Sequence, residues 1–283
     1  MLKKPFFSIV IPTLNEEKYL PLLLEDLSKQ TFIDFEVIHV DGNSEDKTVK
    51  KAGEWRKKFY LKTEKTKTRN VSFQRNLGGK KARGEWIIFM DADNRLPSFF
   101  LRGIRYRLDR EPRTDVFTTW VKVKKQTPKY QSTERAINIG QEIMKNLGKE
   151  VALGAMIGVK KQIFEKIKFD ETQKVVEDTL FVNEVIKAGY TFSLFRDPKY
   201  YFSMRRIESE GTLKQAFVSS RLLVQFLQGK NFSEKDFGYF MEGGSYYEKQ
   251  SSSVFKNILT TIEKTSEKQL QKVKKILSDI KEF

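Results

Sequence analysis

The sequence predicts an α/β fold, in which helices cover a mostly parallel sheet and a helical C-terminal extension follows. In the first part of the chain, short apolar segments alternate with longer segments of helical period, the order typical of right-handed βαβ units. Several of the short segments are apolar almost throughout, as expected of strands buried on both faces. Beyond Gly211 the apolar residues recur with helical spacing only.

Turn residues bound each predicted strand. The predicted strands are residues 6–12, 35–41, 58–63, 85–91, 115–123 and 151–159. Helices are predicted between the first four of them, at residues 15–30, 44–59 and 69–84. The first of these helices is expected to begin at Asn15, whose side chain can cap it, with Glu16 and Glu17 placed favourably in its first turn.

Composition excludes several kinds of functional site. The 283 residues include no cysteine, so disulfides, thiolate nucleophiles and zinc–sulfur sites are ruled out. His39 is the only histidine, which rules out mechanisms that need two imidazoles, and its position inside a predicted strand indicates a buried or sheet-face residue. A formal net charge of +16 predicts attraction to polyanions such as nucleic acid, anionic lipid or phosphorylated small molecules, although much of it can be solvated surface.

The apolar runs are too short to span a bilayer, and the N-terminus reads as a strand rather than a signal peptide. We therefore expect a cytoplasmic protein, or one that lies on the cytoplasmic face of a membrane. The tail at residues 254–280 has apolar residues along one side and lysines elsewhere. Such a helix can lie on an anionic membrane or bind a partner, and it can equally pack against its own domain.

Carboxylates follow the ends of the predicted parallel strands. Asp41 ends the second strand, and the fourth runs into Asp91 and Asp93, with only Ala92 between them. Ligands of open α/β sheets bind outside the carboxyl ends of the strands, so these side chains are expected around one site. Two such carboxylates can hold Mg²⁺ or Mn²⁺, which bridges a diphosphate, and a small residue between them lets the backbone approach a nucleotide. Aspartates in these positions can also simply cap turns.

The sequence contains neither a G-x-G-x-x-G after the first strand nor a P-loop. Instead, three segments occur in order: "FSIVIPTLNEEKYLPLLLEDLSKQTFIDFEVIHVDGNSEDKT", "QRNLGGKKARGEWIIFMDADN" and "VVEDTLF". Together they resemble the family 2 glycosyltransferases with the GT-A fold, over roughly residues 6–201. The resemblance implies a Rossmann-like, mostly parallel mixed sheet. It also implies a catalytic domain at 1–210, with a nucleotide-binding half at 1–95 and an acceptor half at 96–210, followed by the helical extension at 211–283.

The resemblance also assigns residues to the nucleotide. Pro12, Leu14, Glu16 and Asp41 match the positions that hold the nucleoside in the family, with Asp41 accepting a hydrogen bond from the base. The arginine of the family's corresponding helix matches Arg75, which is expected near the nucleotide.

The remaining family positions concern the metal and the catalytic base. Asp91 is expected to contact the ribose and Asp93 the divalent cation, with Ala92 close to the nucleotide. The family's Glu-Asp pair matches Glu177, expected among the donor-binding residues, and Asp178, the candidate general base. Asp41 and Asp178 have a structural alternative, because acidic residues near a helix N-terminus are favourable in any fold.

The resemblance implies an inverting, metal-dependent enzyme that moves a single sugar from a nucleotide-diphosphate sugar, UDP-sugar favoured, to a hydroxyl group. The Glu-Asp pair favours a hydroxyl acceptor, which we expect to be a glycan or lipid-linked glycan. The basic tail suggests peripheral contact with an anionic membrane. Two other classes are compatible with parts of the sequence. A metal-dependent nucleotidyltransferase would also use paired aspartates, and a non-enzymatic nucleic-acid-binding protein would explain the charge.

Overall fold

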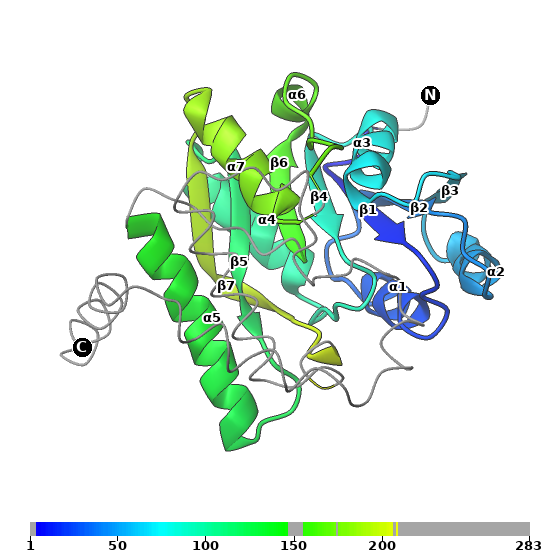
Figure 1. Cartoon of the computed structure of the whole chain (residues 1–283), viewed down its shortest axis with the longest axis horizontal. Helices are drawn as coiled ribbons and strands as arrows, with labels where there is room; N and C mark the ends of the chain where they lie inside the picture. The colour runs from blue at the N-terminus through cyan, green and yellow to red at the C-terminus, as the bar shows by residue number, and fades with distance from the viewer. Residues whose placement is uncertain (1–3, 147–154, 174, 206–207, 209–283) are drawn as a thin grey trace, which may run out of the picture. The chain divides into compact units, whose positions relative to one another are not determined.

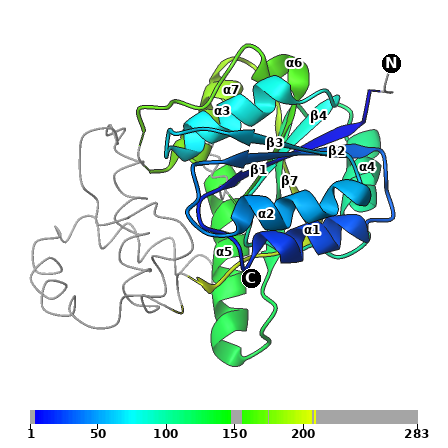
Figure 2. The same cartoon turned by 90° about the vertical axis from the view of Figure 1, so that its right-hand side faces the viewer.

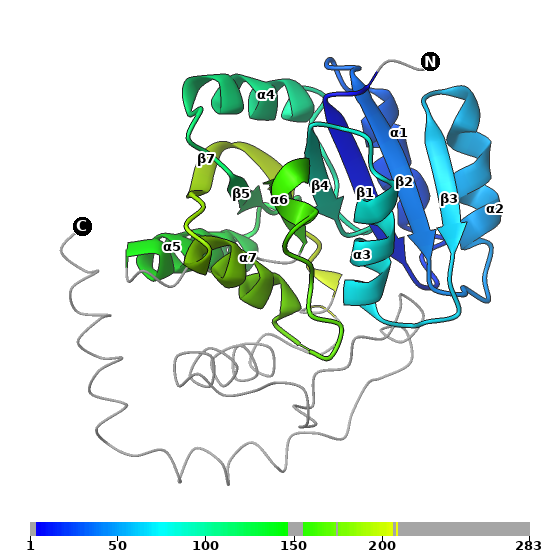
Figure 3. The ribbon, with the colours of Figure 1, turned by 90° about the horizontal axis from the view of Figure 1, so that it is seen from above.

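A seven-stranded mixed sheet forms the centre of the protein, in the order β3-β2-β1-β4-β6-β5-β7 (Figure 1). The computed structural model describes residues 4–146, 155–173, 175–205 and 208. The strands are β1 (Phe7–Thr13), β2 (Phe35–Asp41), β3 (Leu61–Lys65), β4 (Trp86–Met90), β5 (Val116–Lys122), β6 (Met156–Lys160) and β7 (Phe192–Tyr201). Strands β1 to β4 are parallel (Figure 3). Strand β6 runs antiparallel to both β4 and β5. The predicted mostly parallel mixed sheet is confirmed.

Helices cover both faces of this sheet. They are α1 (Leu20–Ser28), α2 (Thr48–Gly53), the 3-10 helix η1 (Glu54–Lys57), α3 (Val71–Lys81), α4 (Phe100–Arg110), α5 (Pro128–Asn146), α6 (Lys161–Phe164) and α7 (Glu177–Lys187). Helices α1 and α2 lie on one face, and α3, α6 and α7 lie on the other (Figure 2). Each face has its own apolar cluster, so the central strands are buried on both sides, as their continuous apolar sequence predicts.

The first helix begins later than predicted. Helix α1 starts at Leu20, with Tyr19 in the cap position and Pro21 in the first turn, so the prediction of a cap at Asn15 is wrong. Asn15 has a left-handed backbone (φ 55°), and its side-chain oxygen accepts a hydrogen bond from Glu45 N at 2.8 Å instead. Residues 14–19 therefore form a loop tied to the loop after β2, which brings Glu16 out of the helix and to the edge of the sheet.

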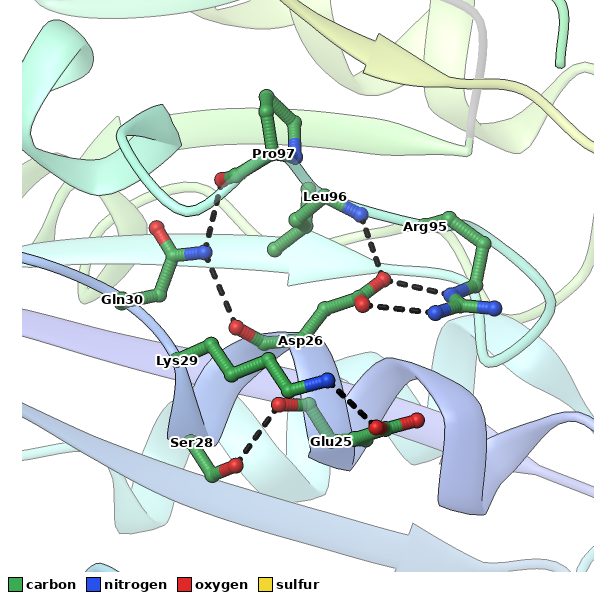
Figure 4. A network of polar contacts seen from close by, with 8 residues as sticks. All are labelled: Glu25, Asp26, Ser28, Lys29, Gln30, Arg95, Leu96 and Pro97. Atoms are coloured by element: carbon green, nitrogen blue, oxygen red, sulfur yellow. Dashed lines mark hydrogen bonds and ion pairs between the residues drawn. The ribbon is translucent and has the colours of Figure 1, made fainter.

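Helix α1 also fixes the loop that carries the two aspartates after β4 (Figure 4). Asp26 accepts hydrogen bonds from Leu96 N at 2.9 Å and from the Arg95 guanidinium at 2.5 and 2.7 Å. Gln30 donates to Pro97 O at 2.9 Å. Charge-assisted, two-pronged pairs of this kind hold backbone more firmly than neutral contacts do, so the position of this loop is set by α1.

Gly158 of β6 pairs with Phe117 of the neighbouring antiparallel strand β5, whose ring covers the glycine. A Cβ atom on Gly158 would lie 2.1 Å from the Phe117 ring, which explains the glycine by packing. His39 is fully buried, as predicted, and its Nε2 lies 2.8 Å from Thr13 Oγ1. Burial lowers the pKa of His39 to about 4, so the ring is neutral at physiological pH.

The C-terminal part of the chain lies outside the described residues. This applies to the predicted helical extension at 211–283 and to the basic tail at 254–280, whose membrane contact stays a prediction. Residues 151–154 of the sixth predicted strand are also outside them. None of the helices that the structure describes has the length and apolar character needed to cross a membrane.

Candidate active site

The carboxyl ends of β1, β2 and β4 meet at one edge of the sheet. Thr13 is paired with Asp41 at the ends of β1 and β2, and β4 runs parallel to β1 with Val10 opposite Phe89. The loop that begins at Asp91 therefore leaves the sheet at the same edge. This is where open α/β sheets bind ligands, and the juxtaposition expected from the sequence is present.

Asp41 is buried and organises the turn after β2. One of its oxygens accepts a hydrogen bond from Ser44 N at 3.0 Å, and the other accepts from Ser44 Oγ at 2.6 Å and from Thr13 Oγ1 at 3.3 Å. Asn15 N donates to the same Ser44 hydroxyl at 2.9 Å, which ties the loops after β1 and β2 together. Asp41 thus has a structural role whatever it binds, and its contact with a base stays a prediction.

Pro12 and Leu14 flank the end of β1. Pro12 is a buried strand residue, and Leu14 is half-buried just beyond the strand. Gln74, on α3, donates to Thr13 O and to Val40 O, both at 2.9 Å, and so joins the ends of β1 and β2. The sequence analysis missed Gln74, which stands directly before Arg75 in the "QRN" segment that carries the family resemblance.

Arg205, which follows β7, brings Glu16 and Asp93 together. Its guanidinium contacts both oxygens of Glu16 at 3.0 Å and Asp93 Oδ2 at 3.2 Å, and it lies 4.4 Å from the centre of the Tyr19 ring. Burial raises the pKa of Glu16 to about 7, against the opposing effect of Arg205. Arg205 and Glu16, which are 189 positions apart in the sequence, therefore meet at the carboxylate edge.

Arg75 forms the second charged cluster. Its side chain is 2% exposed, and its two terminal nitrogens lie 2.7 Å from Glu177 Oε1 and 3.2 Å from Asp91 Oδ1. Glu177 is equally buried, whereas 39% of the Asp91 side chain stays exposed. Desolvation nevertheless raises the pKa of Asp91 to about 6, against the effect of Arg75. The predicted contact of Arg75 with the nucleotide is untested, and its observed partners are carboxylates of two separate segments.

Asp178 lies in the first turn of α7, half-buried and next to Glu177. Its Oδ1 accepts a hydrogen bond from Thr179 N at 2.6 Å. Burial and, after it, the Glu177 carboxylate raise the pKa of Asp178 from 3.8 to about 7, against the opposing effect of Arg75. A carboxyl group with a pKa near neutrality is suited to accept and release a proton.

The residues at this edge fit a divalent cation that is shared with a ligand. No group of three or more His, Cys, Asp or Glu side chains that could hold a metal occurs in the part of the chain that the structure describes. Asp91 and Asp93 supply two hard oxygen donors, and Ala92 between them is small and buried. Mg²⁺ is commonly bound through one or two carboxylates together with substrate phosphates, so this donor set fits such an ion without a complete protein cage.

Tyr200 is a further residue of the site that the sequence analysis did not name. Its side chain is fully buried, and its hydroxyl has no hydrogen-bond partner. Burial and the nearby carboxylates of Asp91, Asp178 and Asp93 raise the pKa of Tyr200 well above 10, so it carries its proton. Strand β7 ends in Tyr200 and Tyr201, and the sequence alone does not indicate that one of them lies near acidic residues.

Comparison with known proteins decides the family. The family model described as "Glycosyl transferase family 2" matches residues 8–168, which contain β1 to β6 and both aspartates of the loop after β4. The chain belongs to glycosyl transferase family 2. This match confirms the family expected from the sequence, and the observed mixed sheet agrees with the expected GT-A fold.

Two curated relatives from Staphylococcus aureus are named for an activity. The poly(ribitol-phosphate) beta-N-acetylglucosaminyltransferase TarS of strain Mu50 is 30% identical over 232 residues, which cover 75% of this chain and 38% of the relative. The enzyme of the same description named TarP, of strain N315, is 27% identical over 216 residues, covering 73% of this chain and 65% of that protein. This family 2 member thus spans less than two thirds of the length of either relative.

Solved structures of glycosyltransferases share the fold of this chain. TarS residues 1–349 of S. aureus, in complex with UDP-GlcNAc, match with a TM-score of 0.56 and 27% identity, covering 70% of this chain and 58% of that one. The mannosyltransferase PcManGT of Pyrobaculum calidifontis, in complex with GDP-Man and Mn²⁺, matches with a TM-score of 0.58 and 16% identity, covering 78% and 65%. At that identity the second likeness shows the fold alone.

Proposed function

We propose that this family 2 member is an inverting, metal-dependent glycosyltransferase that moves one sugar from a UDP-sugar to a hydroxyl group of a phosphate-containing glycan. The observation that carries this proposal is the position of Asp178. It stands in the first turn of α7 with a pKa of about 7, and the Arg75 and Glu177 pair connects its helix to the aspartate loop after β4. A proton acceptor and a candidate diphosphate site thus come from separate segments at one sheet edge.

Asp178 is suited to act as the general base. The acceptor hydroxyl must lose its proton as it attacks the anomeric carbon, and a carboxylate within hydrogen-bonding reach can take it. Burial keeps the pKa of Asp178 close to the working pH, so the group is ionised for attack and is still a useful base. Because the base and the diphosphate site lie on different segments, the hydroxyl can attack opposite to the departing nucleotide, which inverts the anomeric centre.

The loops after β1, β2 and β4 are suited to hold the donor. Asp41 and Glu16 lie where the family resemblance places the nucleoside, and Asp91 and Asp93 would hold Mn²⁺ or Mg²⁺. When bound, this cation neutralises negative charge on the diphosphate. Arg205 pairs with Glu16 and Asp93 in this structure, and its guanidinium has the two-pronged donor geometry that also suits phosphate oxygens.

The proposed donor and acceptor rest on the relatives. TarS and TarP are named for transfer of N-acetylglucosamine to poly(ribitol phosphate), and a TarS structure contains UDP-GlcNAc. A polymer with one negative charge per repeat also complements a chain with a net charge of +16. A lipid-linked glycan would supply the same hydroxyl chemistry, and single-sugar transfer is retained from the sequence analysis.

Calorimetry and a transfer assay test the proposal in sequence. Titration of the full chain with UDP and with GDP, each with and without Mn²⁺, should show UDP binding that strengthens when Mn²⁺ is present. Incubation with UDP-GlcNAc and purified poly(ribitol phosphate) should then release UDP and form β-linked N-acetylglucosamine, detected by NMR of the polymer. Absence of nucleotide binding, or binding that ignores Mn²⁺, would count against the donor site, and an α-linked product would count against inversion.

A further inference from the structure

Three consecutive residues of α3 hold the segments that surround the carboxylate edge. Gln74 joins the ends of β1 and β2, as described above. Asn76 donates to Phe169 O at 2.9 Å, and its side-chain oxygen accepts from Phe169 N at 3.0 Å. Arg75, between them, contacts Asp91 after β4 and Glu177 in the first turn of α7. Helix α3 therefore connects the loop that carries Asp91 and Asp93, where the donor is proposed to bind, with the first turn of α7, which carries Asp178.

The burial of Arg75 sets a strict requirement on its partners. A guanidinium that is 2% exposed has lost almost all of its water, and such a charge is tolerated only when carboxylates and hydrogen bonds replace that water. Glu177 and Asp91 supply the two carboxylates, and the Phe169 ring lies beneath the guanidinium, with its centre 5.3 Å away. Phe169 is in turn stacked on Phe181 of α7, with ring centres 4.2 Å apart. Arg75 thus contacts α7 both by charge and, through Phe169, by packing.

The start of α7 has a backbone that needs such support. Val176, directly before the helix, has a left-handed conformation with φ 55° and ψ 19°. This conformation is strongly disfavoured for a β-branched side chain, and residues in such regions cost about 1–3 kcal/mol each unless the surroundings fix them. Glu177 follows at once, held by Arg75 at 2.7 Å. The ion pair therefore holds Glu177, the residue directly after the strained backbone of Val176.

We propose that Arg75 is a positioning residue for proton transfer: by joining Asp91 to Glu177 it fixes the first turn of α7, and with it Asp178, relative to the donor edge. This inference rests on the proposed function, since it concerns Asp178 as the base. An arginine is required because its planar fork reaches two carboxylates at once, which the single ammonium of lysine cannot do in the same geometry. A displacement of about 1 Å at a catalytic group can cost about 10²-fold in rate.

Three variants and a control ion pair test the role. Arg75→Lys keeps the charge and removes the fork, and Glu177→Ala removes the partner on α7 while leaving Asp91 in place. We expect kcat for UDP-GlcNAc and poly(ribitol phosphate) to fall by about 10²-fold in both, with the dissociation constant for UDP unchanged. Glu177→Gln, which keeps an oxygen for Arg75 to contact, should recover part of the loss in kcat.

The control is an ion pair at the opposite end of β2 whose carboxylate is as buried as that of Glu177, although its arginine, Arg83, is 36% exposed. Glu36 is 1% exposed and contacts the Arg83 guanidinium at 2.7 Å, and it pairs with Ser8 near the start of β1. Glu36→Gln should lower the melting temperature and leave kcat unchanged. An equal loss of kcat in this variant would overturn the inference, because any ion pair with a buried carboxylate would then matter equally. A loss of UDP affinity parallel to the loss of kcat in Arg75→Lys would also overturn it, since Arg75 would then act on the nucleotide.

Hydrogen–deuterium exchange of the full chain separates this inference from the proposed function. The amides of the first turns of α7 should exchange faster in Arg75→Lys than in the wild type, while those of β2 and α1 should be unchanged. Exchange at α7 that equals the wild type would overturn the inference. Since the measurement needs no substrate, it decides the positioning role even if the wild type transfers no sugar, a result that would contradict the proposed function alone.

Discussion

Replacement of Asp178 by asparagine should make the protein more stable and nearly inactive. The pKa of this carboxyl group rises from 3.8 to about 7 in the fold, so the folded state holds the proton more tightly than the unfolded state does. Well below pH 4 both states are protonated, and the stability of the fold does not depend on this group. Between pH 4 and 7 the unfolded state ionises first, which destabilises the fold progressively, and above pH 7 the cost is constant.

The size of the gain follows from that shift. A rise from 3.8 to about 7 corresponds to at most about 4 kcal/mol. Asp178 is only half-buried and solvent screens part of the effect, so we expect Asp178→Asn to gain about 1–3 kcal/mol at pH 8. At pH 4 the gain should fall below about 1 kcal/mol, because the folded wild-type carboxyl group is then neutral and the unfolded one is only partly ionised.

Urea unfolding at pH 4 and pH 8, paired with the transfer assay, measures both effects. Loss of a general base typically lowers the rate by 10²–10⁴-fold, so kcat should fall by about that factor while UDP binding persists. In the wild type, kcat/KM should fall as the pH drops through about 7, because Asp178 becomes protonated. A variant that is less stable at pH 8, or that loses UDP affinity and kcat equally, would refute Asp178 as a desolvated base.

Three further outcomes follow from contacts at the site and in the sheet. Arg205→Met removes the guanidinium 3.2 Å from Asp93, so Mn²⁺ alone, followed by electron paramagnetic resonance, should bind more tightly; weaker binding would contradict competition between the two cations. Glu16→Gln should stabilise the fold at pH 8 by up to about 3 kcal/mol and not at pH 4, because the pKa of Glu16 is raised to about 7 and its ionisation is costly; equal urea midpoints at pH 8 would contradict this. Gly158→Ala places a methyl group 2.1 Å from the Phe117 ring and should destabilise by about 1–3 kcal/mol in urea, with an unchanged midpoint as the contrary result.

The parallel half of the sheet could be predicted closely from the sequence. The predicted strands at 6–12, 35–41 and 85–91 correspond to β1, β2 and β4 within one residue at each end. These strands are buried on both faces, so each is apolar throughout, and turn residues mark its limits. Strand β3 is less accurate, beginning at Leu61 rather than at residue 58, because one side of it is exposed and its sequence is mostly polar.

Strand β7 and helices α4 and α5 were not predicted. Strand β7 contains Arg196, Asp197 and Pro198 in its middle, where the register with β5 shifts, so its sequence has no regular alternation. Helix α5 begins at Pro128 and is largely polar, and it buries Asn138 and Gln141. In β7 and α5, tertiary contacts stabilise an element that its local sequence indicates only weakly. Helix α4 is different, because its buried residues Phe100, Leu101, Ile104 and Leu108 follow a helical period that the sequence analysis overlooked.

The residues of the site were easier to predict than their contacts. Asp41, Asp91 and Asp93 reach the same edge because parallel strands must end together, a consequence of topology alone. No local pattern indicates that Arg75 is buried against Glu177, 102 residues later in the chain, or that Glu16 pairs with Arg205. Those contacts depend on how α7 and the segment after β7 pack. The periodicity of a single sequence does not predict that packing.

The carboxylate edge has a consequence for which anionic ligands can bind there. More carboxyl groups than guanidinium groups surround the strand ends: those of Glu16, Asp41, Asp91, Asp93, Glu177 and Asp178, against the guanidinium groups of Arg75 and Arg205. The chain as a whole carries a net charge of +16, so it attracts polyanions indiscriminately at long range. If the donor binds as proposed, we expect the strand ends to be more selective. Their carboxylates should repel a phosphate group that arrives without a cation and admit a diphosphate that is bound to one.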